Sequence, residues 1–121
     1  MSFRDIHATF AWFVMVSNGI AGLWALAAHN VPTLRHRSLW PFTAAAQVSV
    51  AIQVVLGVAA LRLDGRQVSS IHTFYGFVAL ASVAVIYSYL QQLEPHRYLL
   101  YGFGGLFVMG LAIRAFFLDG P

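Results

Sequence analysis

The sequence predicts an all-α membrane protein, an antiparallel up-down-up-down bundle of four transmembrane helices. Of its 121 residues, 60% are hydrophobic and only 9% are charged, whereas a soluble domain has about 25% charged residues. A soluble core of this size has no room for so much apolar surface, so these side chains must face lipid. Crossing the hydrocarbon takes about 20 apolar residues in a helix, and four stretches of the chain meet that length.

The first two spans are bounded by asparagine and proline. The first begins near the N-terminus and stops before the segment HNVP, because Asn30 and Pro32 break a helix. The second tolerates Pro41 in its first turn, where the missing N–H needs no helical partner. These two spans are expected at about residues 3–28 and 39–63.

The last two spans begin at a serine cap and at a proline. Asp64 and Gly65 signal a chain reversal, and Ser69 or Ser70 then caps the next helix. Pro95 opens the fourth span. Because the connections are short, neighbouring helices should be antiparallel. The two spans are expected at about residues 70–93 and 96–118, and residues 1–121 should form a single domain.

The composition excludes several classes of function. Cysteine is absent, so disulfides and thiolate metal sites are excluded. The net charge of +3 is too diffuse for a nucleic-acid surface. No loop is long enough for a soluble catalytic domain. The expected partners are therefore the lipid bilayer and other membrane subunits or further copies of the chain, with no nucleic acid.

The distribution of arginines predicts the orientation. The positive-inside rule places the surface richer in Arg and Lys in the cytoplasm. We expect the N-terminus inside, in a bacterial cytoplasmic membrane. A cleaved signal peptide is the alternative for the first stretch, but Asp5 and His7 lie where such a peptide would be basic. The arginines expected at the N-terminal surface are Arg4, Arg62, Arg66 and Arg114, and those at the opposite surface are Arg35, Arg37 and Arg97.

Two histidines are expected at one surface and at similar depth. His7 opens the first span and His72 opens the third, and these spans run in the same direction. Two imidazoles that face each other across a bundle are the minimum for axial ligation of a haem iron. Each histidine alone is also an ordinary interfacial residue, so the site depends on the pair. His29 and His96 lie at the opposite surface, where they are either surface residues or a second site.

Glycines and arginines near this pair extend the candidate site. Gly57 and Gly76 would leave space for a flat ring, although small residues also pack membrane helices without any cofactor. Arg114 should lie at the depth of the histidines, where it either neutralises a haem propionate or serves as a stop-transfer residue. Arg62 or Arg66, in the adjacent turn, would supply a second charge.

The segment IQVVLGVAALRLDGRQVSSIHTFYGFVAL resembles the haem A synthase family. In that family a span with the motif Gln-x-x-Leu-Gly is followed by a short turn and a span that opens with a ligand histidine. The matching residues here are Gln53, Leu56, Gly57 and His72. The segment RDIHATFAWFVMV resembles the other ligand helix, with His7 at the ligand position. The resemblance covers three spans and implies that His7 and His72 are axial ligands of a b-type haem in a four-helix bundle.

The chain also departs from that family. The family has two four-helix halves and this chain has one. Arg4 stands where the family has an acidic residue, and the family's extramembrane cysteine pair has no counterpart. We therefore expect no hydroxylation of a haem methyl group, and the resemblance supports the scaffold more than the enzyme.

Two functions follow from these patterns. The first is a small membrane subunit that binds haem b through His7 and His72 for electron transfer or haem handling, within a larger membrane complex. The alternative is a cofactor-free accessory or structural subunit of a respiratory or photosynthetic complex. The chain has no complete catalytic constellation, so it would be at most a redox subunit. Too few polar residues lie within the spans to support a carrier or channel.

Overall fold

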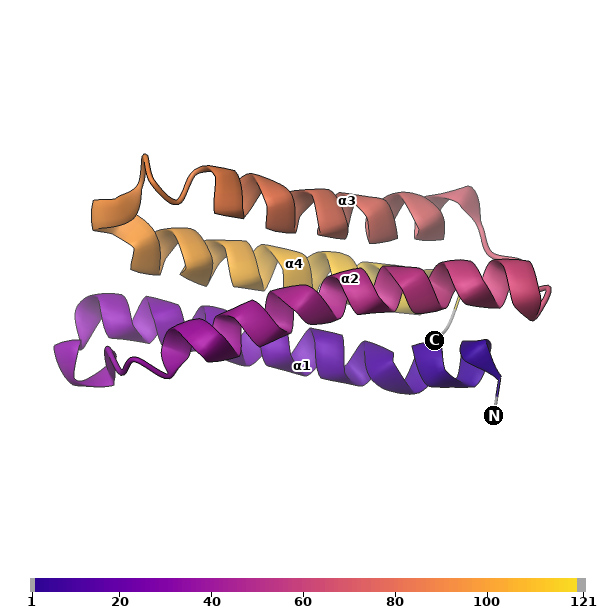
Figure 1. The fold of residues 1–121 in the computed structure, drawn as a ribbon, viewed down its shortest axis with the longest axis horizontal. Helices are drawn as coiled ribbons and strands as arrows, with labels where there is room; N and C mark the ends of the chain where they lie inside the picture. Colours follow the sequence, from indigo (N-terminus) through magenta and orange to yellow (C-terminus); the bar gives the residue numbers. More distant parts are fainter. Residues whose placement is uncertain (1, 120–121) are drawn as a thin grey trace.

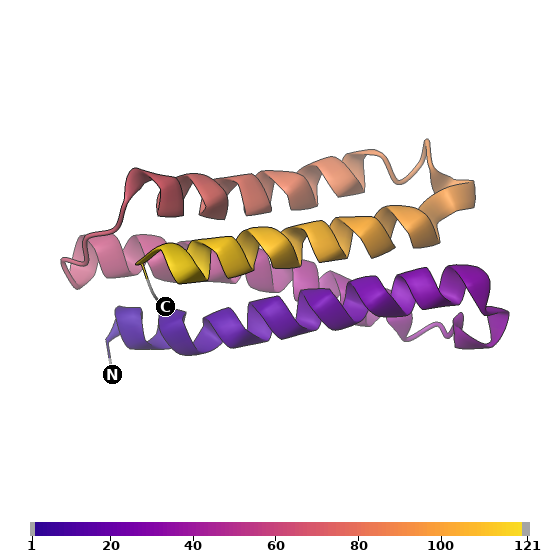
Figure 2. The ribbon, with the colours of Figure 1, turned by 180° about the vertical axis from the view of Figure 1, so that it is seen from behind.

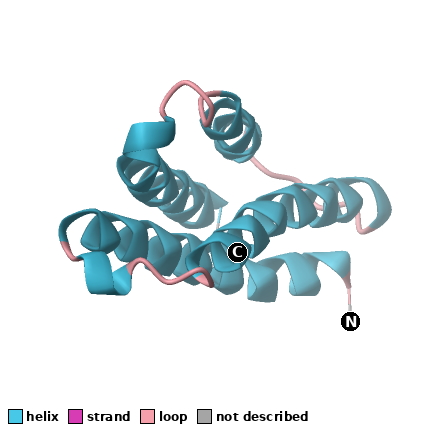
Figure 3. Cartoon of the chain, turned by 60° about the vertical axis from the view of Figure 1, so that its left-hand side comes forward, coloured by secondary structure: helices cyan, strands magenta, loops and turns pink. Residues whose placement is uncertain are grey.

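The computed structural model describes residues 2–119, and this part of the chain is helical with short loops and no strand (Figures 1 and 3). Each of the four long helices is long and apolar enough to cross a membrane. The predicted all-α, four-helix class is therefore confirmed. The elements are α1 (Phe3–Asn30), η1 (Pro32–Leu34), α2 (Leu39–Leu63), α3 (Ser70–Ser88), η2 (Glu94–His96) and α4 (Arg97–Asp119).

Side-chain caps set the starts of α1 and α3. Ser2 and Asp5 form a capping box, in which the Ser2 hydroxyl accepts from the Asp5 N–H and the Asp5 carboxylate accepts from the Ser2 N–H. At α3, Ser69 is the N-cap and its hydroxyl accepts from the His72 N–H at 3.2 Å. The cap thus fixes His72 in the first turn of α3.

Helix α3 ends at Ser88 rather than near Leu93. The N–H of Tyr89 reaches the carbonyls of both Val85 and Ile86, and the Leu90 N–H bonds to the Tyr87 carbonyl. Such i to i−3 bonds tighten the last turn and end the helix. The chain then passes through a turn into η2, so α4 begins at Arg97.

Helix α4 lies between α1 and α3 (Figures 1 and 2). Helix α1 packs along both α2 and α4, whereas α3 packs mainly on α4 and contacts α2 only lightly. Within the most apolar 18-residue window, 44% of α1 is buried inside the protein but only 11% of α3. Helix α1 is therefore central and α3 is peripheral.

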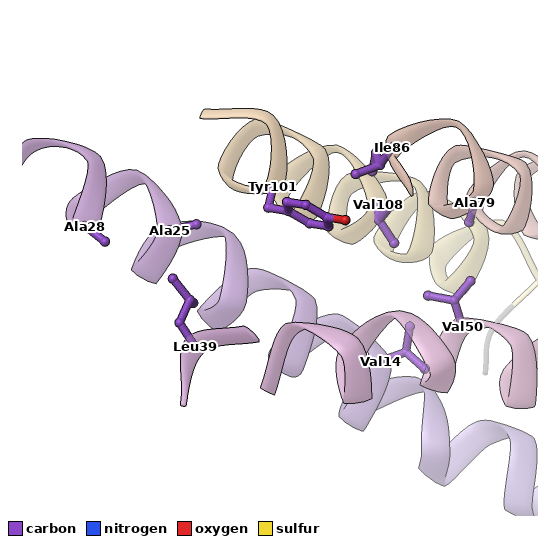
Figure 4. Close-up of a cluster of buried hydrophobic side chains, with 9 residues drawn as sticks. All are labelled: Val14, Ala25, Ala28, Leu39, Val50, Ala79, Ile86, Tyr101 and Val108. Atoms are coloured by element: carbon purple, nitrogen blue, oxygen red, sulfur yellow. The ribbon is translucent and has the colours of Figure 1, made fainter. Parts of the chain in front are cut away.

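The core follows the middle of the bundle. Asn18 ties α1 to α2, because its side-chain amide donates to the carbonyls of Val14 and Ala46 at 2.9 and 3.1 Å. This pairing satisfies a polar group within an apolar span. The buried apolar cluster in Figure 4 consists of Val14, Ala25, Ala28, Leu39, Val50, Ala79, Ile86, Tyr101 and Val108.

Candidate cofactor site

The imidazoles of His7 and His72 meet between α1 and α3. Their ring centroids lie 6.3 Å apart, with an angle of 62° between the ring planes. His7 is buried, with 8% of its surface exposed, and His72 is half-buried. The two residues are far apart in the chain, and each comes from the N-terminal part of its helix.

Backbone carbonyls orient both rings. Nδ1 of His7 lies 3.1 Å from the Gln53 carbonyl oxygen on α2, and Nδ1 of His72 lies 2.8 Å from the Ala115 carbonyl oxygen on α4. Because a carbonyl only accepts, each Nδ1 carries a proton, which leaves Nε2 as the ring nitrogen that could ligate a metal. A histidine that ligates a metal usually donates its other ring N–H to a carbonyl or carboxylate in this manner. The hydrogen bonds at Nδ1 of the two rings are thus of the kind common among metal-ligating histidines.

A second hydrogen bond joins His7 to Gln53. The side-chain amide of Gln53 donates to the His7 carbonyl at 2.9 Å, while the Gln53 carbonyl accepts from the His7 ring. The two residues therefore hold each other through both backbones. This pair fixes the register of α1 against α2 at the level of the site.

The two glycines of the site have different surroundings. A Cβ added to Gly57 would lie 3.0 Å from Cε1 and 3.4 Å from Nδ1 of His7, so the missing side chain lets the imidazole lie against α2. A Cβ added to Gly76 would meet no atom within 4 Å. Gly57 thus accommodates His7 itself, and Gly76 borders open space.

An apolar cavity surrounds the histidine pair. It has a volume of about 110 Å³ and opens to the outside, which is below the roughly 300–1,000 Å³ usual for small-molecule sites. All four helices contribute to its wall, and the wall follows α2 from Val50 to Leu61 and α3 from His72 to Ala79. The polar or glycine residues discussed above that line it are His7, Gln53, Gly57, Arg66, His72 and Gly76.

Only one of the three candidate arginines reaches this cavity. Gly65 has φ +68, a left-handed conformation that favours glycine. The chain folds back there, so that the Arg66 N–H bonds to the Ala60 carbonyl and the Arg66 side chain lies buried in the cavity wall. Arg62 and Arg114 are exposed and do not line the cavity. The structure therefore brings Arg66 to the histidine pair and leaves the other two outside.

The remaining histidines form no comparable pair. His29 is half-buried in the last turn of α1, and His96 is exposed in η2. Among residues 2–119, no three His, Asp or Glu side chains gather as a metal site.

Of the two residues whose carbonyls orient the histidines, Gln53 could be predicted from the sequence and Ala115 could not. A side-chain amide within an apolar span is costly unless it is hydrogen-bonded, and this cost marks Gln53 as a residue with a partner. Ala115 carries no such signal, because it acts through its backbone carbonyl and any residue would supply one.

Comparisons of the chain with protein-family models, with curated proteins and with solved structures found no match.

Proposed function

We propose that this is an integral membrane protein that binds a b-type haem through His7 and His72, for electron transfer or haem handling. Its four helices would cross the bilayer as an up-down-up-down bundle with the N-terminus inside. The bundle supports this, because large apolar side chains cover its outer surface, as they do in proteins that face lipid. On α1 alone these include Trp12, Phe13, Val16, Ile20 and Leu23.

The separation of the two imidazoles carries the haem proposal. A metal lies about 2.0–2.1 Å from a ligating imidazole nitrogen, so two imidazoles that ligate one metal must lie close together. The ring centroids of His7 and His72 lie 6.3 Å apart, with 62° between the ring planes. The same distance also suits an edge-to-face contact between rings, so the haem content must be measured.

The chemistry of the surrounding residues suits the group. The cavity wall is mostly apolar, the side of Gly76 is open, and Arg66 places a cation at the edge of the site to pair with a propionate. A bound haem supplies reversible one-electron chemistry at its iron. Because His7 and His72 would both ligate the iron, the site would favour electron transfer over oxygen chemistry. We also propose that the chain shares the four-helix scaffold of one half of a haem A synthase.

The second candidate is a cofactor-free accessory subunit of a larger membrane complex. The exposure of α3 favours it, since only 11% of its most apolar window is buried inside the protein. That surface is open to lipid, to another subunit or to a second copy of the chain. A haem-binding subunit within such a complex would combine both proposals.

A reduced-minus-oxidised spectrum of the purified protein tests the haem proposal. We expect a b-type α-band that is lost in His7→Ala and in His72→Ala and is kept in His29→Ala and His96→Ala, which remove imidazoles at the opposite end. A colourless wild-type protein that purifies with stoichiometric partners would favour the accessory subunit. Loss of the band in the two control variants instead would move the site to the other end of the bundle.

A further inference from the structure

Arginine and aromatic side chains gather at the end of the bundle opposite the histidine pair. The turn between α1 and α2 and the turn between α3 and α4 both lie at this end (Figure 1). The guanidinium carbons of Arg35 and Arg97 lie 5.0 and 5.4 Å from the ring centroid of Tyr98. Arg97 also lies 5.1 Å from the ring of Trp40, which packs against Tyr98. We call Arg35, Trp40, Arg97 and Tyr98 the arginine–aromatic cluster.

The charge at this end is positive. Arg37 lies beside the cluster in the chain and is exposed. The acidic residue of the two turns is Glu94, whose carboxylate lies 3.0 Å from the guanidinium of Arg97. The two turns thus contain three arginines and one carboxylate, and the guanidinium of Arg35 donates to the carbonyls of Ala28 and His29. Trp and Tyr side chains such as those of the cluster normally mark the membrane–water interface. An anion at that depth would be attracted to the cluster.

An apolar groove begins at the same end. It lies between α3 and α4, and its wall on α4 extends from Leu99 to Phe107, about 12 Å along the helix axis. Apart from His96 at its outer end, Ser82 is the one polar side chain in its wall within residues 2–119. The groove is shallow and open to the outside, and its apolar wall suits a hydrocarbon chain that lies against it.

We propose that this end binds an anionic glycerophospholipid, with its phosphate on Arg37 and Arg97 and an acyl chain in the groove between α3 and α4. Guanidinium groups bind phosphate through paired, charge-assisted hydrogen bonds, and basic pockets between membrane helices select anionic headgroups. A zwitterionic choline lipid should bind less tightly, because the positive charge of its choline group is repelled by the arginines. This proposal depends on the membrane insertion proposed above and is independent of the haem.

Native mass spectrometry of protein from bilayers of equimolar phosphatidylglycerol and phosphatidylcholine tests the headgroup. We expect the wild type to retain phosphatidylglycerol preferentially. In the double variant Arg37→Gln/Arg97→Gln, the ratio of retained phosphatidylglycerol to phosphatidylcholine should fall about fivefold for each arginine removed. The matched control Arg4→Gln/Arg114→Gln removes the same charge from exposed positions at the opposite end, and it should keep the preference.

A second pair of variants tests the groove. Ala81→Phe would fill it, whereas Ala84→Phe adds the same ring on an exposed part of α3 outside it. We expect only Ala81→Phe to reduce lipid retention. Equal retention of both lipids by the wild type, or equal losses in the two arginine variants, overturns the proposal. Displacement of the lipid by inorganic phosphate would also overturn it, since the site would then bind a free anion.

The same samples test the lipid proposal separately from the proposals of membrane insertion and haem binding. Resistance to alkaline carbonate extraction measures membrane insertion, and the α-band of the wild type measures the haem. An embedded, haem-containing protein without lipid preference defeats the lipid proposal alone.

Discussion

At the residue scale, the two imidazoles of the site are held in different ways. His7 is fixed by α2, which provides the Gln53 carbonyl for its ring, the Gln53 amide for its backbone and the space of Gly57. His72 is capped by Ser69 of its own helix, and its ring bonds to the Ala115 carbonyl of α4. The position of His72 therefore depends on how α3 lies against α4. Residues that border the open side of the cavity, rather than His7, should control what enters.

Gly76→Leu tests this control with little risk to folding. Neither Gly76 nor Gly110 has an atom within 4 Å of an added Cβ, but only Gly76 lines the cavity. Leucine at either position gains up to about 1 kcal/mol of helix propensity. We expect Gly76→Leu to remain folded and to lose most of its haem, as measured by the α-band per protein, whereas Gly110→Leu keeps it. A Gly76→Leu protein with full haem content would show that the group lies elsewhere.

At the element scale, α1 and α4 approach each other through glycine. A Cβ on Gly22 would lie 2.8 Å from the Gly102 carbonyl oxygen and 2.9 Å from the Leu106 nitrogen, both backbone atoms of α4. Small residues let membrane helices pack this closely, where dispersion contacts replace the missing hydrophobic drive. This crossing holds α4, which contributes Ala112, Ala115 and Phe116 to the cavity wall, against α1.

Comparing Gly22→Ala with Gly19→Ala distinguishes contact with rigid backbone atoms from contact with a flexible side chain. At Gly22 the added methyl meets rigid backbone, so α1 and α4 must move apart, at a cost of about 1–3 kcal/mol. At Gly19 it meets Sδ of Met109 at 2.6 Å, and that flexible side chain can move away. Unfolding in detergent, followed by circular dichroism, should show the loss mainly in Gly22→Ala. Equal losses in both variants would contradict a role for the backbone approach.

At the scale of the whole molecule, the order of helices places the two turns that contain Thr33 and Gln91 at one end and the turn that contains Gln67 at the other (Figure 1). An up-down-up-down bundle across a bilayer would expose these ends to different compartments. The histidine site and the arginine–aromatic cluster would then lie near opposite membrane surfaces. Electron transfer and lipid binding would thus use separate ends of one small bundle.

Single-cysteine labelling measures this topology directly, because the sequence contains no cysteine. Thr33, Gln67 and Gln91 are all exposed. With the N-terminus inside, an impermeant maleimide added to intact cells should label Thr33→Cys and Gln91→Cys, and it should label Gln67→Cys only after permeabilisation. The reverse pattern would keep the bundle and invert its orientation. Labelling of Gln67→Cys and Gln91→Cys from the same side would contradict the bundle.

The sequence by itself determined the four helices and the end at which His7 and His72 lie. Span length and apolarity depend on the transfer free energy of each residue, which is a property of composition along the chain. The ends of the spans at Asn30, Pro32 and Ser69 also follow from local backbone chemistry. The end of α3 was less predictable, because the i to i−3 bonds at Tyr89 carry no distinctive residue signal.

Only the tertiary structure decided which side chains surround the histidine pair. Arg62, Arg66 and Arg114 have the same chemistry and similar expected depth, but the fold-back at Gly65 takes Arg66 alone into the cavity wall. The Ala115 carbonyl that orients His72 is chemically the same as any other. Lateral packing and backbone direction select among equivalent groups, and these depend on contacts between helices that no single stretch of sequence contains.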